Sequence, residues 1–349
     1  MDANPILGTA IFLLGGVAAA TYLLPFRAVR SWRYETAWLV SVLAGWVAFP
    51  LVFDAVVLPT GLWAVLKQGD GLVFARSFGF GALWGVGALS WALMVRYLGV
   101  GLGLGIGAGL CAATGTLLPP LFTGRAATLV ATPGARLVLA GVGVSLVGIA
   151  AVGLAGRLKE GEMSEAAKKK AVAEFDFKKG LVSALVAGVA SAGINFGLQG
   201  ASAWEQAAIA GGASPTWAGM PVLTVVLWGG VTTQVVWVGW KRMKELKRRN
   251  GLLSTDSLFN LRHLFLCSLS GVVGVMQFVL QKAGEPQMGD LRYASFAILM
   301  TSAVFCSTIL GVFLGEWRGT SRRTKSLLSF GVLVLALGFA VMSFGGKPS

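Results

Sequence analysis

The sequence predicts an all-α polytopic membrane protein with ten transmembrane helices arranged as two five-helix inverted repeats. Its 349 residues are 55% hydrophobic and only 13% charged, whereas soluble domains carry about 25% charged residues. Apolar runs of about twenty residues, the length that crosses a bilayer as a helix, recur along the chain. Lys and Arg gather in the short gaps between these runs, as the positive-inside rule describes. These three observations favour one membrane domain.

Ten apolar runs are candidate spans. They cover residues 5–26, 36–58, 72–95, 98–122, 136–157, 180–203, 216–240, 261–281, 291–315 and 325–345. The first has no basic residues before it and exceeds a signal-peptide core in length, so we expect it to be an uncleaved span. Pro50 lies inside the second run and should kink that helix. Only a short break near Arg96 separates the third run from the fourth.

Every second residue of the fourth run is glycine from Gly99 to Gly109. In water each interior glycine costs a helix about 1 kcal/mol relative to alanine, but in lipid a helix is the only way for one segment to satisfy its own backbone. The helical spacing gives two interleaved GxxxG series that allow close approach of a neighbour. We therefore expect this helix to be a packing centre within a monomer.

The gaps differ in their positive charge. Of the 29 Lys and Arg residues, 22 lie in the odd-numbered gaps and seven elsewhere. The odd-numbered gaps should therefore face the cytoplasm, and ten spans would place both termini in the periplasm. This distribution accounts for the net charge of +14 without a nucleic-acid partner.

A mixed-charge segment from Arg157 to Lys179 is the longest gap between apolar runs. We expect it to form an amphipathic cytoplasmic helix that divides the chain into a first five-helix repeat (1–157), a charged linker (158–179) and a second five-helix repeat (180–349). Because five is odd, the second repeat would be inverted relative to the first, as in many secondary transporters.

Residues suited to enzymatic or metal chemistry are sparse. Cys111, Cys267 and Cys306 lie far apart inside apolar runs, which argues against disulfides or a metal site. His263 is the only histidine, and no pair of carboxylates shares a helical face, as acid–base catalysis would require. We expect no enzyme, no cofactor and no metal, and the short gaps leave no room for a sensor domain.

Several stretches resemble one transporter family along nearly the whole chain. They are YLLPFRAVRSWRYETAWL (22–39), FGALWGVG (80–87), MVRYLG (94–99), the glycine segment through GTLLPP, GRLKE (156–160), FKKGL (177–181), SAGINF (191–196) and GEWRGTSRR (315–323). In order and spacing they are similar to the L-rhamnose-proton symporter family of the drug/metabolite transporter superfamily. The resemblance implies a carrier of the bacterial inner membrane that imports a deoxy sugar with a proton by alternating access.

A sugar site needs flat aromatic faces for the C–H surface of the ring and neutral groups for its hydroxyls. Trp84 and Trp91 are seven residues apart and share a helical face, although tryptophans at the lipid interface have the same pattern. The amide candidates are the i,i+4 pairs Asn195 with Gln199 and Gln277 with Gln281. Hydrogen bonding between helices is their alternative role. Gln277 is our first choice, because the resemblance places a glutamine there.

Proton coupling normally needs an acid whose pKa burial has raised. No acid lies at mid-span: Asp54 and Glu205 lie near outer ends, and Glu35 and Glu316 near inner ends. Glu35 is the first candidate, because the resemblance includes its WxxETxW motif, and Glu205 is the second. The neighbouring arginines make a surface ion pair the alternative for Glu35. Sodium coupling, plain facilitation, and export of a metabolite or drug remain alternative functions.

Overall fold

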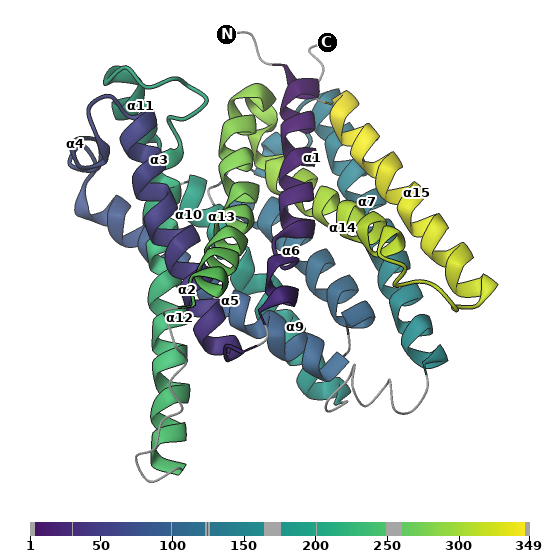
Figure 1. Ribbon diagram of the computed structural model, residues 1–349. Coiled ribbons are helices and arrows are strands. Elements are labelled where there is room, and N and C mark those ends of the chain that lie inside the picture. The colour runs from purple at the N-terminus through teal and green to yellow at the C-terminus, as the bar shows by residue number, and fades with distance from the viewer. Residues whose placement is uncertain are drawn as a thin grey trace.

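The computed structural model consists of helices throughout the part of the chain that it describes (Figure 1). That part comprises residues 4–29, 31–98, 100–122, 124, 126–163, 176–199, 201–248 and 260–345. Within it, nine helical segments are long and apolar enough to cross a membrane. The prediction of an all-helical, multi-pass membrane protein is therefore confirmed.

The first half of the chain supplies five long helical segments. Its elements are α1 (Pro5–Thr21), the 3-10 turn η1 (Pro25–Ala28), α2 (Tyr34–Leu43), the π-helical turn η2 (Ala44–Ala48), α3 (Phe49–Val57), α4 (Leu62–Leu66), α5 (Gly71–Leu98), α6 (Val100–Phe122), the 3-10 turn η3 (Ala126–Leu129) and α7 (Pro133–Glu162). The α2, η2 and α3 segments together form the second span. The fourth predicted run corresponds to α6, a helix of 23 residues.

The second half supplies the remaining long helices. Its elements are α9 (Phe177–Ser191), α10 (Gly193–Gln199), α11 (Ser202–Ala210), α12 (Met220–Arg248), α13 (Leu261–Gly284), the 3-10 segment η4 (Glu285–Ala294), α14 (Ser295–Phe313) and α15 (Arg322–Gly345). The helix predicted for the charged linker falls on residues 164–175, which lie outside the described residues. At one end of the linker the chain continues α7 to Glu162, and at the other end α9 begins at Phe177.

Local sequence signals set several helix starts. The side chains of Asn4, Thr132 and Asn260 accept hydrogen bonds from backbone N–H groups in the first turns of α1, α7 and α13. Proline follows the first two of these caps directly. Its missing N–H costs nothing in a first turn, where that donor has no intrahelical partner. These starts therefore follow from sequence alone.

The second span changes its helical register at η2, immediately before Pro50. Proline has no N–H to donate to the carbonyl four residues earlier, and a π-helical turn accommodates that interruption. At the same point the backbone of Gly45 lies against α13, because a Cβ atom added there would be 2.2 Å from the carbonyl oxygen of Gly271. The kink predicted at Pro50 thus takes the form of a π-helical turn that packs against α13.

Gly107 and Gly109 are the glycines of the glycine-rich segment whose contacts the structure describes. A Cβ added to Gly107 would be 2.6 Å from the sulfur of Met94, but one added to Gly109 would meet nothing closer than 3.8 Å. Between α5 and α12 the backbones are closer, since a Cβ on Gly81 would lie 2.0 Å from the carbonyl oxygen of Val226. Among the described residues, the α5–α12 contact is therefore tighter than those of the predicted packing centre.

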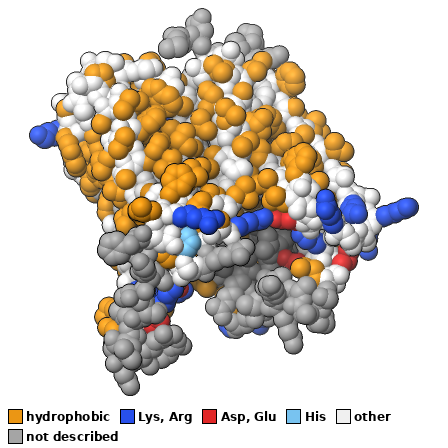
Figure 2. Space-filling model, in the orientation of Figure 1, with side chains coloured by type: hydrophobic (Ala, Val, Ile, Leu, Met, Phe, Trp, Pro, Cys, Tyr) orange, Lys and Arg blue, Asp and Glu red, His pale blue; other side chains and the backbone are white. Residues whose placement is uncertain are grey.

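Hydrophobic side chains form a broad band across the face shown in Figure 2. Elsewhere in the described residues, Val56, Phe122 and Phe313 are 78–81% exposed, as side chains that face lipid tails would be. Lys and Arg gather along the lower border of the band in this view. The band and its basic border are the surface expected of a membrane-embedded bundle.

Candidate functional site

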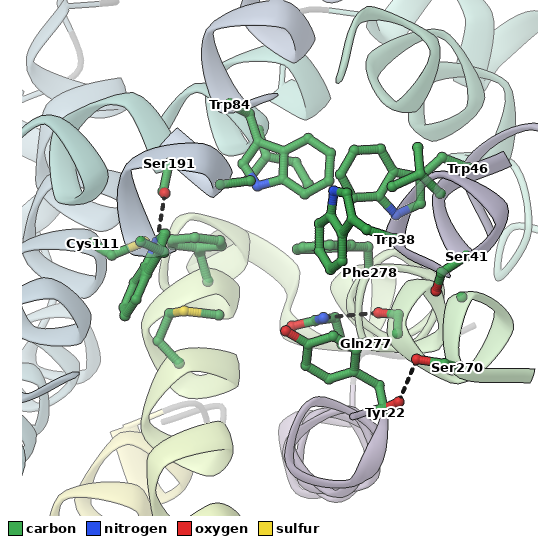
Figure 3. Close-up of a pocket in the computed structure, with 18 residues that line it drawn as sticks. Tyr22, Trp38, Ser41, Trp46, Trp84, Cys111, Ser191, Ser270, Gln277 and Phe278 are labelled. Atoms are coloured by element: carbon green, nitrogen blue, oxygen red, sulfur yellow. Dashed lines mark hydrogen bonds between the residues drawn. The ribbon is translucent and has the colours of Figure 1, made fainter. Parts of the chain in front are cut away.

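The described helices line a partly open cavity of about 230 Å³ (Figure 3). Pockets for drug-sized ligands occupy about 300–1,000 Å³, so this one suits a smaller molecule. Both halves of the chain contribute to its wall. The lining residues are Tyr22, Trp38, Ser41, Val42, Trp46, Trp84, Ala88, Trp91, Cys111, Ser191, Ile194, Ser270, Gly271, Gly274, Gln277, Phe278, Phe296 and Met300.

One side of the cavity is a group of aromatic rings from α2, η2, α5 and α13 (Figure 3). The centroids of Trp46 and Trp84 are 4.4 Å apart, and Trp84 meets Phe278 edge-on at 5.4 Å. Trp38 meets Trp46 edge-on at 6.5 Å. Packed rings lose little conformational entropy on binding, so this wall is a prearranged apolar surface.

Tyr22 and Gln277 lie across the cavity from these indoles (Figure 3). The amide nitrogen of Gln277 donates to the carbonyl oxygen of Gly274 at 2.8 Å, and the hydroxyl of Ser270 donates to the carbonyl oxygen of Tyr22 at 2.6 Å. These bonds fix the end of α1 and the side chain of Gln277 on α13. The carbonyl oxygen of Gln277 is thereby left available to a ligand.

The cavity presents neutral hydrogen-bonding groups. Within the described part of the chain, no hydrogen bond is made by the indole N–H groups of Trp46 and Trp84, the hydroxyls of Tyr22 and Ser41, or the carbonyl oxygen of Gln277. All the described lining residues are uncharged. Flat rings beside uncharged donors and acceptors match the two surfaces of a sugar.

Two of the indoles that line the cavity, those of Trp38 and Trp91, donate hydrogen bonds to neighbouring side chains. Trp38 donates from its indole nitrogen to the carbonyl oxygen of Gln234 at 3.0 Å, and Gln234 donates to the carbonyl oxygen of Gly85 at 3.0 Å. Trp91 donates to the hydroxyl of Ser191 at 2.9 Å. Gln234 is fully buried, so it positions Trp38 and links α12 to α5.

The predicted sugar-binding residues separate into two groups. Trp84, Trp91 and Gln277 line the cavity. Asn195 and Gln281 are buried outside the lining, where the amide nitrogen of Gln281 donates to the carbonyl oxygen of Asn195 at 3.4 Å. Asn195 in turn donates to the carbonyl oxygen of Gly115, so this pair joins α6, α10 and α13. The side chain of Gln199 lies outside the described residues.

The two predicted coupling acids are both paired with cations. Glu35 accepts from Lys241 at 2.9 Å at the end of the bundle where α2 begins. Glu205, on α11, accepts from Lys282 at 2.7 Å and from Arg292 at 3.2 Å. Neither acid lines the cavity.

Glu205 belongs to a four-residue ion cluster, which we call the outer cluster: Glu205, Lys282, Glu285 and Arg292. Lys282 is 2% exposed and lies 2.7 Å from Glu285 as well as from Glu205. Arg292 also pairs with Glu285, at 3.4 Å. The cluster joins α11 to the end of α13 and to η4, at the end of the bundle opposite to the start of α2.

Sequence reasoning missed several of the lining residues. They are Tyr22, Trp38, Ser41, Trp46, Ser270 and Phe278. A usable signal existed for one pair, because Trp38 and Trp46 are eight residues apart, close to two helical turns. Ser41 and Ser270 carry no such signal, since a serine in a span usually bonds to its own helix.

Comparison with known proteins covers almost the entire chain. The family model for the L-rhamnose-proton symport protein matches residues 1–347. Proteins named L-rhamnose-proton symporter share 35% identity in Cronobacter sakazakii, 33% in Klebsiella pneumoniae and 32% in Escherichia coli, each over 97% of both chains. The predicted resemblance is confirmed: this chain belongs to the L-rhamnose-proton symport protein family.

Proposed function

We propose that this chain imports L-rhamnose, or a similar deoxy sugar, together with a proton. The observation that carries the proposal is the cavity, whose aromatic wall faces free neutral hydrogen-bonding groups. Relatives that align with nearly the whole chain are named for this activity. In a 6-deoxy sugar such as L-rhamnose a methyl group replaces the hydroxymethyl group, and the apolar side chains of Val42, Phe296 and Met300 offer a surface for it.

We further propose ten membrane spans in two inverted repeats, bounded as 1–157 and 180–349 with the linker 158–179 between them. The first support is that α1 begins and α15 ends at the same end of the bundle (Figure 1), because a chain that ends where it began crosses an even number of times. With α6 as the tenth crossing, the count is even.

The pattern of helix contacts supports the repeat. Each span of one repeat has a counterpart five spans away in the other repeat. If every span is replaced by its counterpart, the contacts of α1 with α13 and α14 become the contacts of α9 with α5 and α6. All four of these contacts are observed. The same replacement also exchanges the α5–α12 pair with the α13–α2 pair, and it leaves the α7–α15 pair unchanged. A symmetric contact pattern is what two related five-helix units produce.

The orientation follows from the distribution of basic residues. The proposal places both termini in the periplasm and the Lys- and Arg-rich border of the apolar band in the cytoplasm. The cavity residues of the second span lie in its first half, from Trp38 to Trp46, which is the cytoplasmic half. This arrangement, with the outer cluster closed, fits an inward-facing carrier. An alkaline phosphatase fusion at the C-terminus should be active, and a silent one would reverse the orientation.

The sequence-based hypothesis for coupling assigns the proton to Glu35 or Glu205. It predicts that Glu35→Gln or Glu205→Gln abolishes accumulation driven by a pH gradient. Their ion pairs with Lys241 and Lys282 are also compatible with roles in holding the two ends of the bundle. Membrane lipids around a monomer complete the proposed set of partners.

Uptake of radiolabelled L-rhamnose by a transport-deficient bacterium tests the proposal. Cells that express the chain should accumulate L-rhamnose, and a protonophore should abolish accumulation without abolishing equilibration. Dependence on sodium would indicate the sodium-coupled alternative, and accumulation only in inverted vesicles would indicate export. An excess of unlabelled D-glucose should compete far less than L-rhamnose does. No uptake by correctly inserted protein would refute the proposal.

A further inference from the structure

Asp54, on α3, is the most deeply buried acid outside the outer cluster. Its side chain has no solvent exposure. The hydroxyl of Thr224, on α12, donates to its Oδ2 atom at 2.7 Å. The Oδ1 atom has no hydrogen-bond partner among the described residues. Thr224 is also fully buried, so the contact between α3 and α12 encloses this carboxyl group.

The elements that pack against α3 bring no cation to Asp54. On α12 the first charged residue is Lys241, seventeen positions after Thr224, which is about 25 Å along a helix. Lys67, after α4, is exposed, and Tyr34 and Glu35 lie at the far end of the second span. No described salt bridge involves Asp54.

An ionised carboxylate in this setting would be costly. Removing a carboxylate from water costs several kcal/mol, which an ion pair or several hydrogen bonds must offset. Asp54 has one hydrogen bond, whereas Glu35 and Glu205 each have at least one cation within 3.2 Å. The packing observed around Asp54 therefore favours the neutral acid.

The helices that carry Asp54 and Thr224 also contact the indoles of the cavity. Asp54 lies eight residues after Trp46, about 12 Å along the same span. Thr224 precedes Gly230 by six residues on α12. A Cβ atom added to Gly230 would lie 2.7 Å from the ring of Trp84 and 3.3 Å from that of Trp46. A change in the α3–α12 contact would therefore reach both indoles.

We propose that Asp54, and neither Glu35 nor Glu205, carries the transported proton, a role that rests on the proposed symport. In the outward-facing state its carboxylate takes a proton from external water, so that an O–H bond forms and the negative charge is lost. The neutral side chain then permits α3 to close against α12 in the arrangement seen here. When the O–H bond breaks and the proton leaves to the cytoplasm, the returned charge destabilises this contact and favours reopening to the outside.

Transport by purified protein in liposomes tests this role. The Asp54→Asn variant is permanently neutral and nearly isosteric, so it should retain exchange of internal for external L-rhamnose. Under an inward proton gradient it should no longer accumulate the sugar above the external concentration. Asp70→Asn is the matched control, because Asp70 is an exposed helix cap whose acceptor oxygen, bonded to the N–H of Val73, is kept by asparagine. Asp70→Asn should accumulate L-rhamnose as the unmodified protein does.

Each outcome separates the two proposals. If the unmodified protein itself fails to accumulate L-rhamnose under the gradient, the proposed symport is wrong. If it accumulates the sugar and Asp54→Asn does so equally, Asp54 is not the proton carrier. If a correctly folded Asp54→Asn protein loses both exchange and accumulation, this role is also contradicted.

Thr224→Val provides a second test should Asp54→Asn fail to fold. Thr224 donates to the carboxyl group and thereby stabilises its charged form, and hydrogen bonds to charged groups contribute about 1.5–3 kcal/mol. Removal of this one hydrogen bond should strengthen proton binding by Asp54 roughly tenfold or more. Gradient-driven uptake should then persist to higher external pH in Thr224→Val than in the unmodified protein. An unchanged pH profile would contradict the proposal.

Discussion

The side chain of Gln277 shows how one residue can be prepared for a ligand before the ligand arrives. Its amide nitrogen is bonded to the carbonyl oxygen of Gly274, which fixes the rotamer and turns only the acceptor oxygen to the cavity. Sugar hydroxyls are donors as well as acceptors. A fixed acceptor opposite the indole N–H groups of Trp46 and Trp84 would therefore set the orientation of a bound sugar.

Replacement of Gln277 by alanine should weaken sugar binding. The loss of one hydrogen bond inside a cavity costs about 1–3 kcal/mol, which corresponds to roughly a 5- to 150-fold rise in the half-saturating sugar concentration. Uptake at low L-rhamnose concentration should then fall by the same factor, with normal insertion in the membrane. Gln206→Ala, at an exposed position on α11, is the control and should transport normally. Normal uptake by Gln277→Ala would remove this residue from the site.

The residues that sequence could identify are those whose chemistry is unusual in a span. Gln277 and the Trp84–Trp91 pair stood out because amides are costly in lipid and the two indoles share a helical face. Ser41 and Tyr22 did not, because their place in the cavity depends on which helices meet. Asn195 and Gln281 stood out for the same reason as Gln277, yet in the structure they bond to each other.

The second span shows what an element adds beyond its residues. Ideal helical spacing would place Trp38 and Trp46 on nearly one face, but Trp46 lies within η2, where the helical register changes. The turn also brings Gly45 and Gly271 into backbone contact. Sequence indicated the interruption through Pro50 but not the type of turn, since the contact with α13 comes from a distant part of the chain.

Gly271→Ala should test the backbone contact between α13 and the second span. A Cβ atom at this position would lie 1.9 Å from the carbonyl oxygen of Ser41, so the helices must separate. Overpacking of this kind costs about 1–3 kcal/mol, and the melting temperature in detergent should fall accordingly. Gly239→Ala, on α12, meets no atom within 4 Å and should melt no lower than the unmodified protein. Equal melting temperatures for both variants would contradict this contact.

The span pattern was the most predictable level of the fold. Long apolar runs leave the backbone no alternative to helix in lipid, so the ranges match the helices to within a few residues for most spans. The short helices α4 and α11 were missed because they lie in gaps with no span-length hydropathy. Their packing depends on Trp204, which is fully buried and donates to the carbonyl oxygen of Leu66 at 3.1 Å.

At the scale of the whole molecule, transport requires that the cavity open to one side at a time. The outer cluster lies where α11, α13 and η4 meet, and at the opposite end Lys241 of α12 pairs with Glu35 of α2. An ion pair that bridges helices is stable only while those helices are together. Both sets are formed together in this structure, so each holds the helices that it bridges at its own end of the bundle.

Removal of the buried lysine should shift the carrier towards its outward-facing state. Lys282→Met leaves Glu205 and Glu285 with Arg292 as their remaining cation. The loss of one partner from a buried pair costs about 3–5 kcal/mol, and this cost falls on the state in which the outer end is closed. The ratio of outward-facing to inward-facing protein should rise by about 100-fold or more.

Labelling of a cysteine in the cavity measures this shift. In a background in which Cys111, Cys267 and Cys306 are alanine, Ser41→Cys should react slowly with a membrane-impermeant thiol reagent applied outside intact cells. Addition of Lys282→Met should accelerate the reaction, whereas Lys67→Met, at an exposed lysine beside α4, should not. If Lys282→Met and Lys67→Met react at the same rate, the outer cluster stabilises the fold and does not control access to the cavity. A closed outer end that depended on these ion pairs would open when Lys282 is removed.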